Sequence, residues 1–159
     1  MPSLPILRPV LAILLAAGLA ACSGGDRASR LAGDSFDIPD RYGTPALRSL
    51  VATHARREGV PLELVHRVVM RESRYNPAAR NGPYWGLMQI HPQTARTMGF
   101  RGEPRDLLDP DTNLRYAVRY LRGAWLVADG DMDRAVMWYA RGYYYEARDR
   151  GMLEVTGLR

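Results

Sequence analysis

Along residues 44–151, hydrophobic positions recur three and four residues apart, which is the spacing of amphipathic helices. Thr44 followed by Pro45 begins the first helix, and Gly59 ends it. Capping residues, prolines and glycines bound further apolar stretches and predict helices over residues 61–73, 92–99, 109–128, 131–140 and 143–151. No stretch alternates convincingly between apolar and polar residues, and there is no internal repeat, so the sequence predicts a mainly α domain.

The predicted helix over residues 61–73 carries an ionisable group on its apolar face. Val65, Val68, Val69 and Glu72 are spaced i, i+3, i+4 and i+7, which places the carboxylate on the hydrophobic stripe. Burial disfavours a charged carboxylate, so we expect a raised pKa, as a general acid near neutral pH requires. Arg71 is expected to point about 100° away from Glu72. On spacing alone, Glu72 could equally be a surface residue at a fraying helix end.

A turn-rich stretch follows this carboxylate. Asn76 and Pro77 break the helix, and Asn, Gly and Pro residues keep positions 81–86 irregular. Irregular backbone beside a buried acid is a common way to form the wall of a cleft. Three aromatic residues could stack on sugar rings there or could belong to the core: Tyr75, Tyr84 and Trp85.

Several short motifs together resemble the soluble lytic transglycosylase (SLT) domain, a lysozyme-like family. They are Glu72-Ser73, Asn76-Pro77, Gly86-Leu87-Met88-Gln89-Ile90, Pro92, Thr94-Ala95, Asp109-Pro110, Asn113-Leu114, Tyr120-Leu121 and a last block within residues 135–142. The resemblance covers nearly all of the part expected to fold, residues 42–159. It implies a lysozyme-like helical domain with an irregular cleft loop.

The resemblance also implies an activity, which is cleavage of peptidoglycan between N-acetylmuramic acid and N-acetylglucosamine. Glu72 would protonate the leaving oxygen and then accept a proton from the C6 hydroxyl of muramic acid, which leaves a 1,6-anhydro end and consumes no water. Glycosidases that use water generally need two carboxylates. Glu63 and Glu103 lie outside the motifs, and helix capping or surface roles are expected for Asp106, Asp109 and Asp111. A lysozyme-type hydrolase and a glycan-binding module with little turnover are the alternatives.

Five further residues are implied to contact the glycan strand, namely Gln89, Tyr139, Asn81, Met88 and His91. Gln89 and Tyr139 match family positions that line the cleft, although a backbone-bonded glutamine and a core tyrosine are the alternatives. Asn81 stands where the family often has a serine, and His91 stands where many members have methionine.

Two other departures from the family pattern affect the expected substrate contacts. The spacing from Glu72 to Gly86 is one residue shorter than the commonest form. The family block Ala-Tyr-Asn-Ala-Gly reads Trp-Tyr-Ala-Arg-Gly in residues 138–142, so Ala140 replaces the usual asparagine.

The N-terminus predicts export and a lipid anchor. Arg8 precedes an unbroken apolar run over residues 10–21, which is too short for a permanent membrane span and typical of a signal peptide over residues 1–21. Leu19-Ala20-Ala21-Cys22 resembles the bacterial lipobox, which implies lipidation of Cys22. The following Ser23 implies the periplasmic face of a Gram-negative outer membrane, with residues 22–41 as a polar tether. The alternatives are cleavage that leaves a free cysteine, or a buried core helix.

Composition narrows the possible partners. The net charge is +5 and all 22 basic residues are arginine, but no basic arm or RNA-binding signature is present, so we expect a solvated basic surface and no nucleic-acid partner. His54, His66 and His91 are far apart, and the single cysteine forms no cluster, so we expect no metal and no cofactor. The expected partners are glycan strands and, through the anchor, the membrane, and we expect a monomer.

Overall fold

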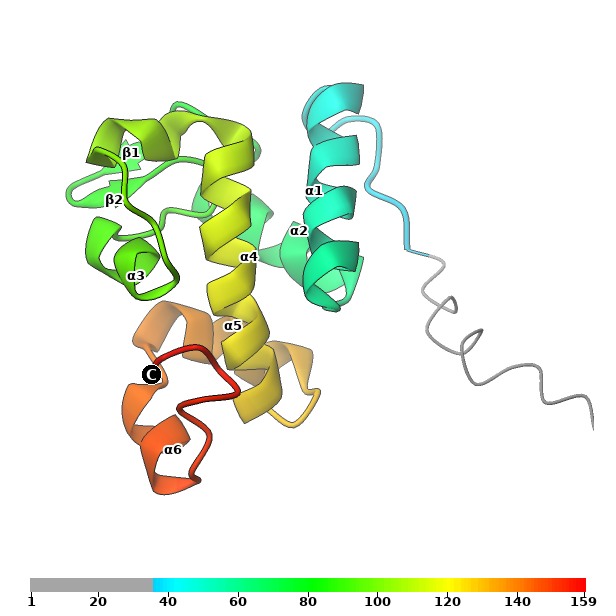
Figure 1. Ribbon diagram of the computed structural model, residues 1–159. Coiled ribbons are helices and arrows are strands. Elements are labelled where there is room, and N and C mark those ends of the chain that lie inside the picture. The colour runs from blue at the N-terminus through cyan, green and yellow to red at the C-terminus, as the bar shows by residue number, and fades with distance from the viewer. Residues whose placement is uncertain (1–35) are drawn as a thin grey trace, which may run out of the picture. The chain divides into compact units, whose positions relative to one another are not determined.

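The computed structural model describes residues 36–159, and helices are its main elements (Figure 1). Its elements are α1 (Pro45–Glu58), α2 (Leu62–Glu72), β1 (Arg80–Asn81), β2 (Tyr84–Trp85), α3 (Pro92–Thr97), the 3-10 helix η2 (Pro104–Leu108), α4 (Pro110–Val127), α5 (Met132–Arg141) and α6 (Tyr144–Asp149). The prediction of a mainly α fold is confirmed, and each expected helix is present with ends displaced by a residue or two.

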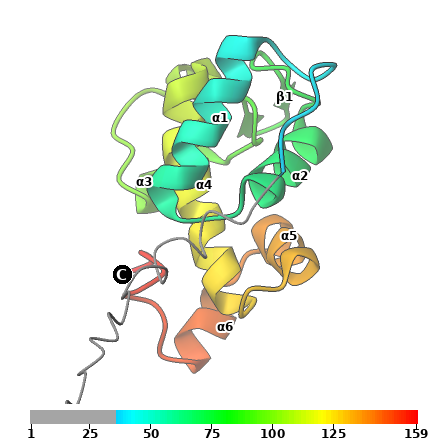
Figure 2. The same cartoon turned by 90° about the vertical axis from the view of Figure 1, so that its right-hand side faces the viewer.

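Helix α4 is the central element of the domain. It packs against α1, α3, α5 and η2, and Figure 1 and Figure 2 both show it running between the other helices. Pro110 occupies its first turn, and the Asp109 side chain caps it by accepting a hydrogen bond from the Thr112 backbone N–H (2.8 Å). Its buried face is lined by Leu114, Ala117, Val118, Leu121, Ala124 and Val127. A long helix with a broad apolar face can hold both halves of a small domain around one core.

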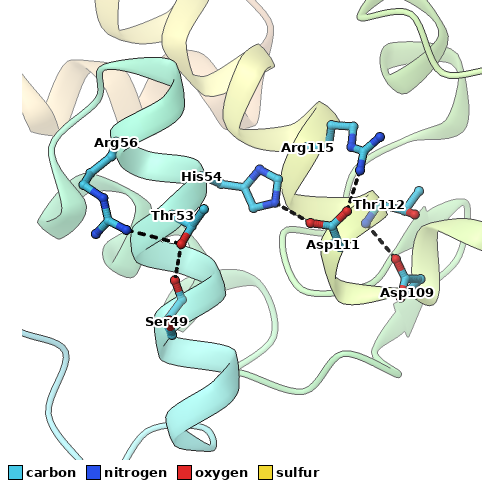
Figure 3. Close-up of polar contacts among 8 residues, drawn as sticks. All are labelled: Ser49, Thr53, His54, Arg56, Asp109, Asp111, Thr112 and Arg115. Carbon is cyan, nitrogen blue, oxygen red and sulfur yellow. Dashed lines mark hydrogen bonds and ion pairs between the residues drawn. The ribbon is translucent and has the colours of Figure 1, made fainter.

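A buried histidine joins α1 to the first turn of α4, as Figure 3 shows. His54 is only 2% exposed, and its Nε2 donates to Oδ1 of Asp111 at 2.9 Å. Arg115 donates to the other oxygen of the same carboxylate (2.6 Å). These hydrogen bonds, from His54 first and then Arg115, lower the pKa of the Asp111 carboxyl. Asp109 therefore has the capping role expected for it, whereas Asp111 links two helices.

Two short strands interrupt the helices and were not predicted from the sequence. In β1 and β2, Arg80 pairs with Trp85 and Asn81 with Tyr84 in antiparallel register, and Trp85 also bridges to Ile90. Strands of two residues are too short to produce an alternating pattern. The hairpin gives the predicted irregular loop a fixed shape.

Asn113 on α4 fixes the loop that follows this hairpin. Its side chain is fully buried, and its Oδ1 accepts from the Met88 backbone N–H (3.0 Å). Its Nδ2 donates to the carbonyls of Trp85 and Leu107 (both 2.8 Å). Gly86 permits this close approach, because a Cβ there would lie 2.4 Å from the Asn113 Nδ2 and its φ is +72°. The amide uses both donors and its acceptor on buried backbone groups.

Described residues that precede Tyr42 pack onto the domain. Ile38 is 3% exposed and belongs to the core, and the Phe36 ring lies 5.2 Å from the His66 ring. Residues that pack onto the domain therefore precede Tyr42, and the Phe36 ring has its partner on α2. The predicted signal peptide and Cys22 lie outside the described residues. Within residues 36–159, no helix has the length and apolarity needed to cross a membrane.

The buried amide of Asn113 predicts a large effect on stability. Asn113→Ala removes the hydrogen-bond partner of the Met88 N–H and of the Leu107 carbonyl, both in the core. We therefore expect the free energy of unfolding to fall by about 2–4 kcal/mol. Asn113→Asp should also destabilise the domain, because a carboxylate cannot donate to two carbonyls. Urea denaturation followed by circular dichroism measures both, and Asn76→Ala in an exposed turn is the control. Equal losses in the control and the Asn113 variants would contradict this account.

Candidate active site

Glu72 is the last residue of α2 and stands at the edge of the core. Val65, Val68 and Val69 are fully buried, while the Glu72 side chain keeps 23% of its surface exposed. The sequence-predicted stripe is therefore present, with the carboxylate at its outer end. The backbone then turns sharply, with positive φ at Arg74 (52°) and Tyr75 (67°), so the chain leaves the helix and does not cover the carboxylate.

The carboxylate faces a hollow of about 370 Å³, which we call the Glu72 hollow. It is lined by Arg71, Glu72, Asn81, Tyr84, Gln89, Tyr139 and Ala140. Helix α2, the hairpin, the loop after it and α5 each contribute to this lining. The structure thus brings together four of the six predicted cleft residues, Glu72, Asn81, Gln89 and Tyr139. His91 lines an adjoining hollow that shares Tyr84, Gln89, Tyr139 and Ala140 with the first.

Two opposing effects set the protonation of Glu72. Burial raises the pKa of its carboxyl above the ordinary value, and the positive charge of Arg71 lowers it by a smaller amount. The Nε of Arg71 lies 3.6 Å from Oε1 of Glu72, so the expectation that Arg71 points away is wrong. Their Cβ bonds do diverge, but the long arginine side chain can curve back around the end of the helix. The net result is a carboxyl that holds its proton more strongly than an exposed one.

Tyr139 on α5 lines the hollow and has a neutral hydroxyl. Its side chain is 9% exposed, and its hydroxyl donates to the Met88 carbonyl at 2.8 Å. Burial, and then the negative charge of Glu72, raise the pKa of this phenol well above its ordinary value. Its proton is committed to Met88, while the oxygen keeps lone pairs that can accept a hydrogen bond. Tyr139 is both a core residue, with its ring 5.5 Å from that of Tyr120, and part of the hollow's wall.

Gln89 can act toward a ligand only as an acceptor. Its Nε2 donates to the carbonyls of Ala79 (3.0 Å) and Gly86 (2.9 Å), so both amide protons are used within the loop. These bonds hold Gln89 in a left-handed conformation with φ of 47°, which non-glycine residues adopt rarely. The Oε1 is the part left for a ligand. Both interpretations of Gln89 therefore apply in part. Its amide nitrogen is bonded to the backbone, as the alternative held, and its amide oxygen is the atom that the cleft position can offer a ligand.

The structure does not bring the Met88 side chain to the hollow. Met88 is fully buried, and what it offers the site is its backbone, between Asn113 and Tyr139. His91 caps α3 by accepting from the Gln93 N–H through Nδ1, and Tyr84 meets its ring edge-on at 5.8 Å. Tyr84 is 45% exposed and so offers a flat face beside the hollow.

The acidic residues for which no catalytic role was predicted do not line the Glu72 hollow; these are Glu63, Glu103, Asp106, Asp109 and Asp111. Asp106 accepts from the Glu103 N–H, and Glu63 pairs with Arg67. Asp133, which was not predicted from the sequence, lines a neighbouring hollow together with Arg71. Its side chain is 93% exposed and is paired with Arg67 at 3.0 Å. Arg71 and Arg141 were also not predicted to line a hollow. The only signal in the sequence was that Arg71 directly precedes Glu72 and that Arg141 follows Tyr139 by two residues. No group of three potential metal-ligating side chains occurs within residues 36–159.

Comparison with known proteins gives one match. A family model described as the transglycosylase SLT domain matches residues 49–151, which is well over half of the chain and includes the whole Glu72 hollow. No curated protein and no solved structure matches the chain. Helices α2 and α5, the hairpin and the loop over residues 86–89 all fall within the matched span, and the fold is the mainly α, lysozyme-like one. The chain therefore belongs to the transglycosylase SLT family, which indicates an enzyme that cleaves glycosidic bonds in peptidoglycan.

Proposed function

We propose that this protein is a peptidoglycan lytic transglycosylase that cleaves the bond between N-acetylmuramic acid and N-acetylglucosamine and leaves a 1,6-anhydro end. One observation carries the proposal: among the described side chains that line the Glu72 hollow, a single carboxylate is present, and burial raises its pKa. An intramolecular reaction can proceed with one such group, because the substrate supplies its own nucleophile. Hydrolysis generally needs a second carboxylate to activate water or to form a covalent intermediate.

In the proposed reaction, Glu72 acts twice. The protonated carboxyl gives its proton to the glycosidic oxygen as the bond from C1 of muramic acid breaks. The resulting carboxylate then takes the proton of the C6 hydroxyl of the same sugar, whose oxygen bonds to C1. The proton returns to Glu72, the released sugar keeps the first proton, and no water is consumed. The raised pKa favours the protonated starting form.

The surrounding residues suit a glycan strand. The Oε1 of Gln89 can accept from an acetamido N–H, and the oxygen of Tyr139 can accept from a hydroxyl or from the Glu72 acid. Asn81 can donate and accept at the hairpin, and Tyr84 offers an exposed aromatic face. His91 lines the continuation of the cleft, so a strand longer than two sugars has residues to contact beyond Glu72.

Two alternatives remain tied to particular residues. A lysozyme-type hydrolase would require Asp133 as its second acid, since that residue lines the hollow next to Glu72. The exposure of Asp133 argues against this role, and its charge is already compensated by Arg67. A binding module with little turnover would follow if Ala140, in place of the family asparagine, removed an essential contact.

We also propose that the protein is a lipoprotein held at the periplasmic face of the outer membrane. The support comes from the sequence, where a short apolar run ends in Leu19-Ala20-Ala21-Cys22 and Ser23 follows. A lipid anchor would keep the cleft near the wall and so reduce the affinity for glycan that the domain itself must supply.

The product of cleavage tests the activity directly. We expect the full-length protein, purified in detergent, to release anhydromuramic products from purified peptidoglycan, as measured by mass spectrometry. Glu72→Gln should lower the rate by about 10²–10⁴-fold, because the amide cannot transfer the proton. Asp133→Asn is the matched control and should change the rate far less, because Asp133 does not line the Glu72 hollow.

Other product patterns would contradict the proposal in distinct ways. Muramic acid with a free reducing end, together with a comparable loss in Asp133→Asn, would identify a hydrolase with two carboxylates. Glycan binding without any cleavage product from the unaltered protein would identify a binding module.

Removing the cation beside Glu72 should change the pH dependence. Activity requires protonated Glu72, so kcat/KM falls as pH rises through the pKa of this carboxyl. Arg71→Ala removes the charge that lowers this pKa, so we expect the alkaline limb of the kcat/KM profile to move to higher pH. Arg57→Ala, which removes an exposed arginine outside the three hollows, should leave the limb in place. A limb that does not move in Arg71→Ala, or moves to lower pH, would exclude Glu72 as the titrating acid.

The anchor is tested by fractionation. Cys22→Ala removes the only thiol in the chain, so we expect it to abolish labelling by a fatty-acid analogue and to shift the protein away from the membrane fraction. Ser23→Ala keeps the thiol and should remain labelled. Unchanged membrane association of Cys22→Ala would show that the protein is held there by other means.

A further inference from the structure

A second hollow opens beside the acid, between α2 and α5. It measures about 420 Å³ and is lined by Arg71, Asp133, Val136, Met137, Ala140 and Arg141. We call it the arginine hollow. It shares Arg71 and Ala140 with the Glu72 hollow, so the two form a continuous surface. Helices α2 and α5 pack against each other, as Figure 2 shows. Val136, Met137 and Ala140 of α5 give the hollow an apolar part of its lining.

The charges of the arginine hollow are unevenly compensated. Among the described residues, Arg141 forms no ion pair, and its guanidinium lies 5.8 Å from the centre of the Trp138 ring. Asp133 is already paired with Arg67. Arg71 is paired with Glu72, but the proposed reaction starts from the neutral acid form of Glu72. When the enzyme is ready to react, two cations therefore face the hollow and its one carboxylate is held by a third.

We propose that the arginine hollow binds a carboxylate of the peptide attached to muramic acid, so that this enzyme prefers peptide-bearing glycan strands over bare ones. This inference rests on the proposed function, because it places the muramic acid at Glu72. The peptide branches from the sugar that is cleaved, so it must leave the Glu72 hollow close to that sugar. Guanidinium groups bind carboxylates through paired hydrogen bonds. The apolar side chains that line the hollow suit the aliphatic parts of a short peptide.

Arg141 is the specificity-determining residue in this proposal. It occupies the position of the second alanine in the family block Ala-Tyr-Asn-Ala-Gly, so the charge is a feature of this chain and not of the motif. It lines the arginine hollow and the adjoining hollow of His91, but not the Glu72 hollow. A change at Arg141 therefore separates peptide recognition from the pKa of Glu72, which a change at Arg71 would not.

Two substrates test this role. Intact glycan strands and strands stripped of their peptides by an amidase are digested by the full-length protein in detergent, and kcat/KM is measured for each. We expect the unaltered protein to prefer intact strands. Arg141→Ala should lower the ratio of intact to stripped kcat/KM by about 3- to 30-fold, the range for a charge-assisted contact at a partly exposed site. Arg141→Lys should retain part of the preference, and Arg57→Ala should retain all of it.

A binding measurement separates this inference from the proposed activity. In a Glu72→Gln background, calorimetry should show tighter binding of soluble intact strands than of stripped ones, and adding Arg141→Ala should abolish the difference. That result would support the peptide site even if the unaltered protein released no anhydro product. Equal binding of both strands, or an Arg141→Ala variant that weakens both equally, would overturn it. If Arg141→Ala forms anhydro products with an unchanged ratio of intact to stripped kcat/KM, the peptide site would also be overturned, while the proposed activity would stand.

Discussion

The buried amide of Asn113 is the contact on which the geometry of the site depends. It joins α4 to the loop over residues 85–88 through two hydrogen bonds and to η2 through a third, and Gly86 leaves the space for it. That loop in turn presents the Met88 carbonyl, which holds the hydroxyl of Tyr139. A fully buried residue therefore positions part of the wall of the Glu72 hollow. It lies on α4, which packs against α1, α3, α5 and η2.

Two opposing effects set the pKa of Glu72, namely burial and the charge of one neighbouring cation. The valine stripe of α2 brings Glu72 to the edge of the core, where loss of hydration raises its pKa, and Arg71 offsets only part of that effect. Arg71 is half exposed, so solvent weakens its influence. Desolvation dominates because it comes from the packed helix, whereas the ion pair depends on a long and flexible side chain. A site of this kind keeps a proton available without a second carboxylate.

Features determined by local sequence could be predicted, and features determined by distant contacts could not. The helices and the place of Glu72 follow from caps, prolines and spacing within one turn or two. The role of Asn113 and the packing of Phe36 on His66 depend on partners far along the chain, whereas the two-residue strands are too short to give a periodic pattern. The orientation of Arg71 was wrong because the spacing rule describes Cβ directions, not the reach of an arginine. Asp133 was missed because only the fold brings α5 beside α2.

Arg71 connects the chemistry of the two hollows, because it lines both. While it faces an ionised Glu72, it lowers the pKa of that carboxyl. In the proposed complex, a peptide carboxylate in the arginine hollow would compensate the charge of Arg71, and Glu72 would then hold its proton more strongly. Binding of the peptide and protonation of the acid would therefore favour each other, as linkage requires of two sites that share one charge. A bare strand lacks this carboxylate. With such a strand the charge of Arg71 would stay uncompensated and would continue to lower the pKa of Glu72, which disfavours the protonated form that the reaction needs.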